Sequence, residues 1–193
     1  MATIHVLDET TINKIAAGEV VERPASVIKE LIENSIDASA TNIEVEIGDG
    51  GVAYMRITDN GIGMTEEDAR LAILRHATSK IQQVEDLFDI ASLGFRGEAL
   101  ASIASVSHFS LTTRKADSDL GTRITVDGGT FTDCIPYGAA PGTTIEIKDL
   151  FYNTPARRKF LKTERTESSK IQDIVGKPVS YTHLRAHETE LHL

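Results

Sequence analysis

The feature that most constrains the fold is a change of periodicity along the chain. Over residues 26–39, apolar residues recur at helical spacing and share one broad face: Val27, Ile28, Leu31, Ile32 and Ile36. After residue 105, four segments instead alternate apolar and polar residues like half-buried strands, at 106–114, 121–127, 130–136 and 143–149. Helices early and strands late predict an α+β fold, a two-layer α/β sandwich with helices on one face of a mostly antiparallel sheet.

Further elements follow from local signals. Residues 43–47 and 52–58 predict a hairpin around the turn Asp49-Gly50-Gly51. A capping box at 65–68 predicts a helix to about residue 75, and helices are also expected at 10–18, 98–104 and 166–176. Residues 77–97 have mixed character and two glycines near their end, which is typical of a long loop.

Size and charge narrow the function classes. The chain has 193 residues, enough for one domain, and a formal net charge of −9. An acidic domain is not built to hold nucleic acid over its whole surface. One dense basic cluster interrupts the acidic background, and it reads equally well as a solvated helix face or as a phosphate contact: Arg157, Arg158, Lys159, Lys162 and Arg165. The single cysteine, Cys134, is expected to be a half-buried strand residue.

The last residues differ from the rest. Residues 177–193 hold three of the six histidines and have no amphipathic period, so we expect a domain at 1–176 followed by a non-native or out-of-frame tail. No apolar run is long enough to cross a bilayer, and the N-terminus has neither the basic start nor the apolar stretch of a signal peptide. These features predict a cytoplasmic protein without a membrane partner.

Two common nucleotide-binding motifs are either absent from this chain or in the wrong structural context. The chain has no Gly-x-x-x-x-Gly-Lys-Ser/Thr phosphate loop. Residues 48–53 match the dinucleotide pattern Gly-x-Gly-x-x-Ala, but they lead into a strand and not into a helix. A hairpin turn explains these glycines better.

Three other motifs each carry two readings. Glu30 and Asn34 lie one helical turn apart, as a general base and a Mg²⁺ ligand could, although most acidic helix flanks are only solvated. Asp59 ends a strand before Gly61 and Gly63, so it could accept a hydrogen bond from an exocyclic amine or simply form a turn. Residues 93–100 place two glycines before a helix, which suits a phosphate or a flexible connector.

Taken in this order, the motifs resemble the ATPase family of gyrase B subunits, heat-shock chaperones, histidine kinases and MutL. That family combines Glu-x-x-x-Asn, Asp-x-Gly-x-Gly, a glycine-rich lid and a later Gly-Thr, which match residues 30–34, 59–63, 94–97 and 142–143. The sequence of these motifs most resembles the N-terminal ATPase domain of MutL-type mismatch repair proteins. It matches in IAAGEVVERP (15–24), KELIENSIDA (29–38), GFRGEAL (94–100) and FYNTPARRKF (151–160).

The resemblance implies cofactors and site residues. It implies ATP and Mg²⁺, with Glu30 as the catalytic base, Asn34 as the metal ligand, and Asp59 reading the adenine amine with the help of Thr143. The remaining implied nucleotide contacts are Asp37, Ala38, Gly61, Gly63, Met64, Thr78, Lys80, Leu93, Gly94, Phe95, Arg96 and Gly97.

The resemblance also implies partners and a wider architecture. The implied partners are MutS, DNA, a second copy of the chain, and a downstream nuclease or helicase. A second domain with a lysine that reaches the γ-phosphate and a C-terminal dimerisation region are expected to be missing here. The sequence therefore predicts a slow Mg-dependent ATPase switch. A nucleotide-binding module without turnover remains open, and GFRGEAL argues against a chaperone, topoisomerase or kinase relative.

Overall fold

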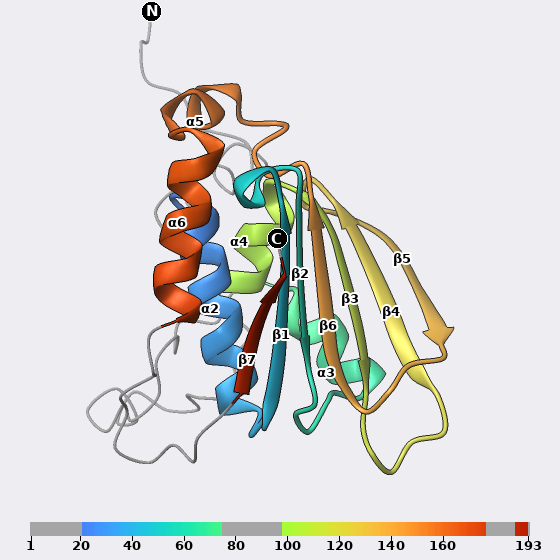
Figure 1. Ribbon diagram of the computed structural model, residues 1–193. Helices are drawn as coiled ribbons and strands as arrows, with labels where there is room; N and C mark the ends of the chain where they lie inside the picture. The colour runs from blue at the N-terminus through green and yellow to red at the C-terminus, as the bar shows by residue number, and fades with distance from the viewer. Residues whose placement is uncertain (1–20, 75–97, 177–187, 193) are drawn as a thin grey trace, which may run out of the picture.

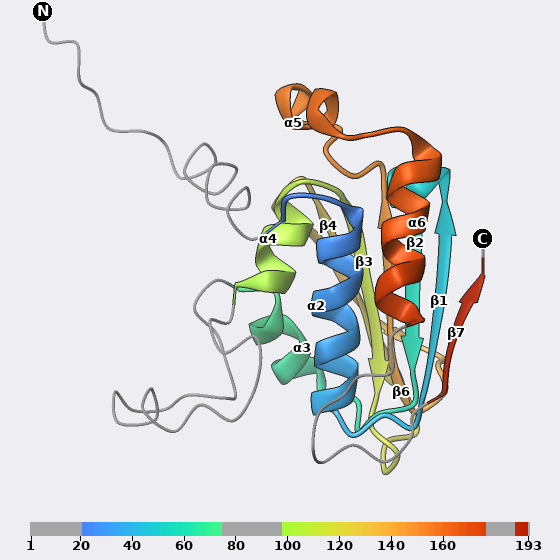
Figure 2. The same cartoon turned by 60° about the vertical axis from the view of Figure 1, so that its left-hand side comes forward.

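The computed structural model describes residues 21–74, 98–176 and 188–192. Within these residues the chain forms one seven-stranded sheet with helices packed on one of its faces (Figures 1 and 2). The predicted α+β sandwich is therefore confirmed.

The strand order in the sheet is β5-β4-β3-β6-β2-β1-β7. β6 lies between β3 and β2 and is antiparallel to both, while β7 runs parallel to β1 at the edge. The strands are β1 (Asn42–Gly48), β2 (Tyr54–Asp59), β3 (His108–Arg114), β4 (Gly121–Asp127), β5 (Thr130–Tyr137), β6 (Gly142–Lys148) and β7 (Glu188–His192). The predicted hairpin is confirmed, since β1 and β2 pair antiparallel around a short 3-10 turn, η1 (Asp49–Gly51).

The helices begin where the sequence offers start signals. α2 (Pro24–Asp37) has proline in its first turn, and the Thr65 hydroxyl caps α3 (Glu66–Ala72) by accepting from the Asp68 N–H at 3.1 Å. The other helices are α4 (Ala99–Ser105), α5 (Pro155–Phe160) and α6 (Glu164–Val175). α2 and α6 lie side by side over the half of the sheet that contains β1 and β2 (Figures 1 and 2).

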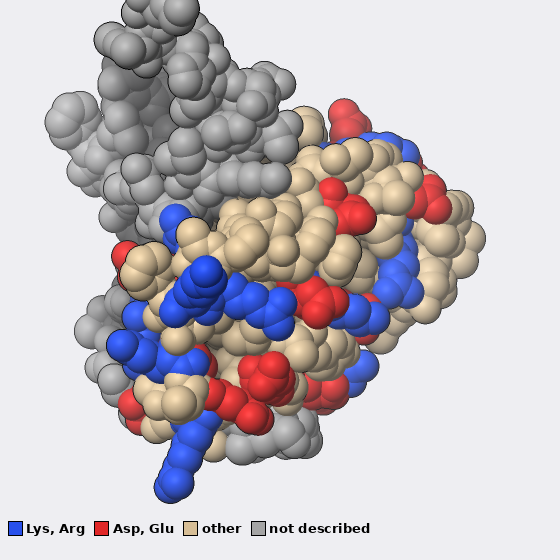
Figure 3. All heavy atoms as spheres, turned by 90° about the horizontal axis from the view of Figure 1, so that it is seen from above, with Lys and Arg blue, Asp and Glu red and all other residues tan. Residues whose placement is uncertain are grey.

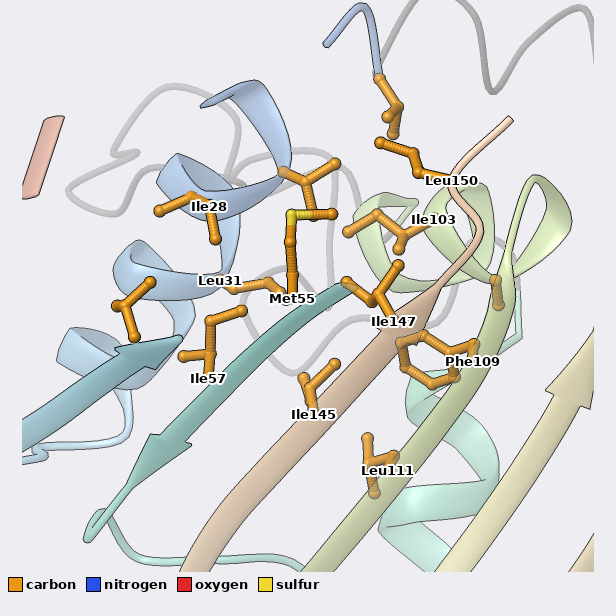
Figure 4. Packing of buried hydrophobic residues seen from close by; sticks show 14 of the residues in the cluster. Ile28, Leu31, Met55, Ile57, Ile103, Phe109, Leu111, Ile145, Ile147 and Leu150 are labelled. Atoms are coloured by element: carbon orange, nitrogen blue, oxygen red, sulfur yellow. The ribbon is translucent and has the colours of Figure 1, made fainter. Parts of the chain in front are cut away.

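The core lies between these helices and the sheet. Ile28 and Leu31 of α2 face Met55 and Ile57 of β2, and the apolar row continues across β6 and β3 (Figure 4). Alternate strand residues are buried in β1, β2, β3 and β4, as the period of two requires. This packing fixes α2 over the sheet and so sets the position of its polar flank.

Two segments differ from the expectation or lie outside it. β5 is exposed on both faces, because it is an edge strand that extends beyond the helix layer, and Cys134 on this strand is half-buried as predicted. The expected helix at 10–18 and the loop at 77–97 lie outside the described residues. Of the tail, Glu188–His192 pairs with Asn42–Glu46 of β1, while the foreign origin of residues 177–193 stays a prediction. Over the described residues, no helix is long and apolar enough to span a membrane.

Candidate nucleotide site

Asp59 is the centre of the site. It is the last residue of β2, and only 9% of its surface is exposed. The Ser35 hydroxyl of α2 donates to its Oδ2 at 2.9 Å, and the Gly61 N–H donates to its Oδ1 at 2.9 Å. The backbone N–H of Thr143 is a third donor. A sheet end, a helix and a loop thus converge on one carboxylate.

Burial of Asp59 disfavours its ionised form, and hydrogen bonds offset part of that effect. Burial raises the pKa of the Asp59 carboxyl, and the hydrogen bonds from Gly61, Ser35 and Thr143 oppose that rise. An ionised carboxylate offers about four acceptor sites. Three donors therefore leave room for one more, and the donor chemistry that fits is an amine or a water molecule.

The loop after Asp59 is pressed against its neighbours. The Ile62 N–H donates to the Ala38 carbonyl oxygen at 2.9 Å, and a Cβ on Gly61 would lie 2.8 Å from the same oxygen. Gly63 has φ +65°, and a Cβ there would lie 2.1 Å from the Arg114 carbonyl oxygen. Both glycines are required by close approach, so the loop lies on the end of α2 and against β3.

Thr143 completes the floor of the site. The β2–β6 register places it directly opposite Asp59, so the two side chains share the helix-covered face. The preceding Gly142 has φ +119°, and a Cβ there would lie 2.0 Å from the Asp59 carbonyl oxygen. The Thr143 hydroxyl lies 3.0 Å from the hydroxyl of Thr113, which also accepts from the Met64 N–H at 2.9 Å.

Helix α2 supplies the remaining predicted residues. Glu30 and Asn34 lie four residues apart and are both half-buried, whereas Asp37 is exposed at the end of the helix. The spacing directs the Glu30 carboxylate and the Asn34 amide to one side of α2. Ser35 follows Asn34 directly and contacts Asp59. Helix α2 therefore places the side that bears Glu30 and Asn34 next to the end of the sheet that bears Asp59.

The described residues cover part of the predicted site. Thr78, Lys80 and residues 93–97 lie outside them, so the predicted phosphate contacts stay predictions. The structure brings together Ala38, Asp59, Gly61, Gly63, Met64 and Thr143 through the contacts above. Sequence reasoning missed Ser35 and Thr113. The available signal was a hydroxyl on an otherwise apolar buried face. Ser35 lies four residues after Leu31 in α2, and Thr113 continues the buried row of Phe109 and Leu111 in β3.

An adenine base fits this arrangement. Asp59 is a buried acceptor with spare capacity, and Gly61 and Gly63 keep side chains away from the loop beside it. For a metal ion, the described residues contain no cluster of three His, Cys, Asp or Glu side chains. A Mg²⁺ ion would therefore depend on the Asn34 amide oxygen together with phosphate and water oxygens, as this ion commonly does.

The family follows from comparison with known proteins. Residues 22–130 match the family described as histidine kinase-, DNA gyrase B- and HSP90-like ATPase. The chain belongs to this ATPase family. The family match spans α2, the Asp59 loop and β3, and so contains most of the site described above.

Within the family, the similar proteins are MutL-type. The chain is 59% identical over 177 residues to the DNA mismatch repair protein MutL of Thermoanaerobacter pseudethanolicus, covering 92% of this chain and 29% of that protein. It is 58% identical to MutL of Caldanaerobacter subterraneus subsp. tengcongensis, covering 91% of this chain and 30% of that protein. The chain thus spans about three tenths of the length of these relatives.

Solved structures agree. The Aquifex aeolicus MutL ATPase domain complexed with ADP matches with a TM-score of 0.62 and 38% identity, covering 81% of this chain and 54% of that one. The N-terminal domain of a DNA repair protein matches with a TM-score of 0.70 and 30% identity, covering 85% of this chain and 47% of that one. The resemblance to the N-terminal ATPase domain of MutL is therefore confirmed.

Proposed function

We propose that this chain is the ATP-binding switch of a MutL-type protein in DNA mismatch repair. The observation that carries the proposal is the buried Asp59 carboxylate, held by Ser35, Gly61 and Thr143 with capacity for one further donor. The MutL relatives and the ADP complex of the Aquifex aeolicus ATPase domain support the choice of an adenine nucleotide.

Each residue has a defined part in this proposal. Asp59 accepts a hydrogen from the exocyclic amine of adenine, and Thr143 lies beside it on the same face. Glu30 would take the proton from the attacking water as general base, and Asn34 would hold the metal ion by its amide oxygen. Bound Mg²⁺ would supply positive charge that neutralises the phosphates. Thr78, Lys80 and residues 93–97 are the proposed phosphate and lid contacts.

The proposed activity is slow, Mg-dependent hydrolysis coupled to partners. In the full-length protein, we propose that MutS signals a mismatch and that nucleotide binding drives association of two copies. The ATP-bound form would then act on a downstream nuclease or helicase and contact DNA. For the chain as given, we expect ATP to be bound more readily than it is hydrolysed, because the family's lysine for the γ-phosphate is expected to lie in a further domain.

Calorimetric titration with Mg-ATP tests the site. Asp59→Asn replaces an acceptor oxygen by an amide group and should weaken ATP binding more than tenfold, since a hydrogen bond to a charged group contributes roughly 1.5–3 kcal/mol. Asp173→Asn, on the exposed side of α6, is the matched control and should bind ATP like the parent chain. Equal ATP affinity in the parent chain and Asp59→Asn would refute the adenine assignment.

A further inference from the structure

Thr113 is a buried hydroxyl that the proposed function leaves unexplained. It ends the inward-facing row of β3 that begins with Phe109 and Leu111, and its exposed fraction is 0%. A valine would fill nearly the same volume with apolar atoms only. Because a buried hydroxyl is unfavourable without hydrogen-bond partners, its contacts should reveal what it does.

Those contacts use the full capacity of the hydroxyl. Its single hydrogen is donated to the Gly142 carbonyl oxygen at 3.0 Å. One of its lone pairs accepts from the Met64 N–H at 2.9 Å. The remaining contact is the Thr143 hydroxyl at 3.0 Å, and Thr113 has only a lone pair left to offer it.

The direction of the last hydrogen bond follows by elimination. Thr143 must donate its hydrogen to Thr113, because Thr113 has already used its own. The Thr143 oxygen then keeps only lone pairs for anything else that approaches it. Thr143 lies opposite Asp59 in register, and an ionised carboxylate is also an acceptor only. Asp59 and Thr143 therefore both present hydrogen-bond acceptors to a ligand.

We infer that Thr113 is a positioning residue that fixes Thr143 as a hydrogen-bond acceptor, so that the site selects bases bearing an exocyclic amine. This inference rests on the proposed nucleotide site. The carbonyl oxygen of a base that bears one in place of the amine would face two acceptors, Asp59 and Thr143. Rejection of such an analogue leaves buried polar groups unpaired and is therefore strong.

The test compares ATP with inosine triphosphate, which carries an oxygen at the position of the amine and a hydrogen on the adjacent ring nitrogen. Purine riboside triphosphate, which lacks the amine but has neither of these changes, separates their effects. Thr113→Val frees the Thr143 hydrogen, which can then rotate toward a ligand oxygen. We expect ATP binding to weaken about threefold to tenfold, as for one neutral hydrogen bond, and the preference for ATP over inosine triphosphate to fall by at least that factor.

Two matched variants control the measurement. Thr113→Ser keeps the hydroxyl and should retain the parent's preference for ATP. Thr112→Val removes a hydroxyl from the adjacent residue of β3, which faces the opposite side of the sheet, and should change neither affinity. Should Thr113→Val fail to fold by circular dichroism, Thr113→Cys keeps the volume, weakens the hydrogen bonds and carries the same comparison.

The outcomes separate the two proposals. A parent chain that binds neither nucleotide would overturn the proposed function, and this inference with it. A parent chain that prefers ATP, with Thr113→Val weakening both nucleotides equally or leaving both unchanged, would overturn this inference alone. A loss of preference confined to Thr113→Val or Thr113→Cys would support it.

Discussion

Asp59 is a residue whose burial opposes folding at neutral pH. Burial raises the pKa of its carboxyl in the folded chain above the unfolded value of about 3.9. A raised acid pKa means that the fold prefers the protonated form. The contribution of this group to stability is therefore fully present below pH ~3.9 and is lost as the pH rises through the raised pKa.

Asp59→Asn should make this dependence visible, because an amide does not titrate in that range. Relative to the variant, the parent chain should lose unfolding free energy as the pH rises from about 4 toward neutrality. Urea unfolding of both proteins at a series of pH values measures the difference. A difference that is flat across the series would contradict the assigned cause of the pKa shift.

Glu30, the proposed general base, lies one helical turn before Asn34 in α2 and can be tested by substitution. In the full-length protein, Glu30→Ala should keep ATP binding and lower the rate of hydrolysis by a factor of roughly 10² to 10⁴, as loss of a general base does. Glu33→Ala, which breaks the ion pair with Lys29 on the adjacent stripe of α2, is the control and should hydrolyse normally. Parent-like hydrolysis by Glu30→Ala would exclude it as the base.

Sequence patterns marked the residues that stand in motifs, but they did not mark the residues that contact and support them. Asp59, Gly61 and Thr143 stand in spaced patterns whose chemistry can be argued directly. Ser35 and Thr113 contact partners 24 to 49 residues away, and no local pattern marks such pairs. Their hydroxyls become informative only when the fold shows which buried atoms they satisfy.

At the scale of elements, α2 and the β1–β2 hairpin were predicted to within a few residues, because strong periodicity and turn glycines mark them. β5 was expected to be half-buried like the other strands, and it is exposed on both faces. Alternation along a strand predicts its conformation, but burial also depends on a neighbour that covers it. The alternating pattern of β5 did not indicate that this edge strand lacks a covering neighbour.

Helix α5 carries three residues of the basic cluster, Arg157, Arg158 and Lys159, and allows a test of DNA contact. Arg157 donates to the Val21 carbonyl oxygen at 3.0 Å and so has a structural role, whereas Arg158 and Lys159 are exposed. Figure 3 looks down on the end of the molecule that bears α5 and shows basic and acidic side chains interspersed there. Any phosphate contact on this end must therefore be local.

If α5 contacts phosphates, Arg158→Gln with Lys159→Gln should weaken DNA binding by the full-length protein. The slope of log affinity against log salt should also become smaller by about two, because each phosphate contact contributes roughly 0.9. Binding measured at several salt concentrations gives this slope. Lys115→Gln with Lys148→Gln is the control, and an equal slope in all proteins would leave α5 as a solvated helix face.

At the scale of the whole molecule, the sequence predicted the layers but not the strand order. The insertion of β6 between β3 and β2 pairs it with β2, whose residues lie more than 80 positions earlier in the chain, as Asp59 does from Thr143. Likewise, no pattern in residues 177–193 predicted that Glu188–His192 would lie against β1.

The tail can be tested by deletion. Removing residues 177–193 should change the melting temperature by only about one or two degrees, because terminal segments commonly contribute little to stability and β7 adds only one edge strand to the sheet. Deletion from residue 164 onward is the contrasting control, since it also removes the buried Ile171 of α6 and should lower the melting temperature strongly. A large drop for the shorter deletion would show that the tail belongs to the fold.

The place of β6 has a consequence for synthesis of the chain on the ribosome. Until residues 142–148 emerge, the β1–β2 hairpin and the β3–β4–β5 meander have no strand between them, and β2 and β3 each present an open edge. Open edges invite pairing with other nascent chains. The last antiparallel strand to be made closes both edges in one step and brings Thr143 beside Asp59. A nascent chain therefore gains the floor of its proposed nucleotide site only when both of these edges are closed.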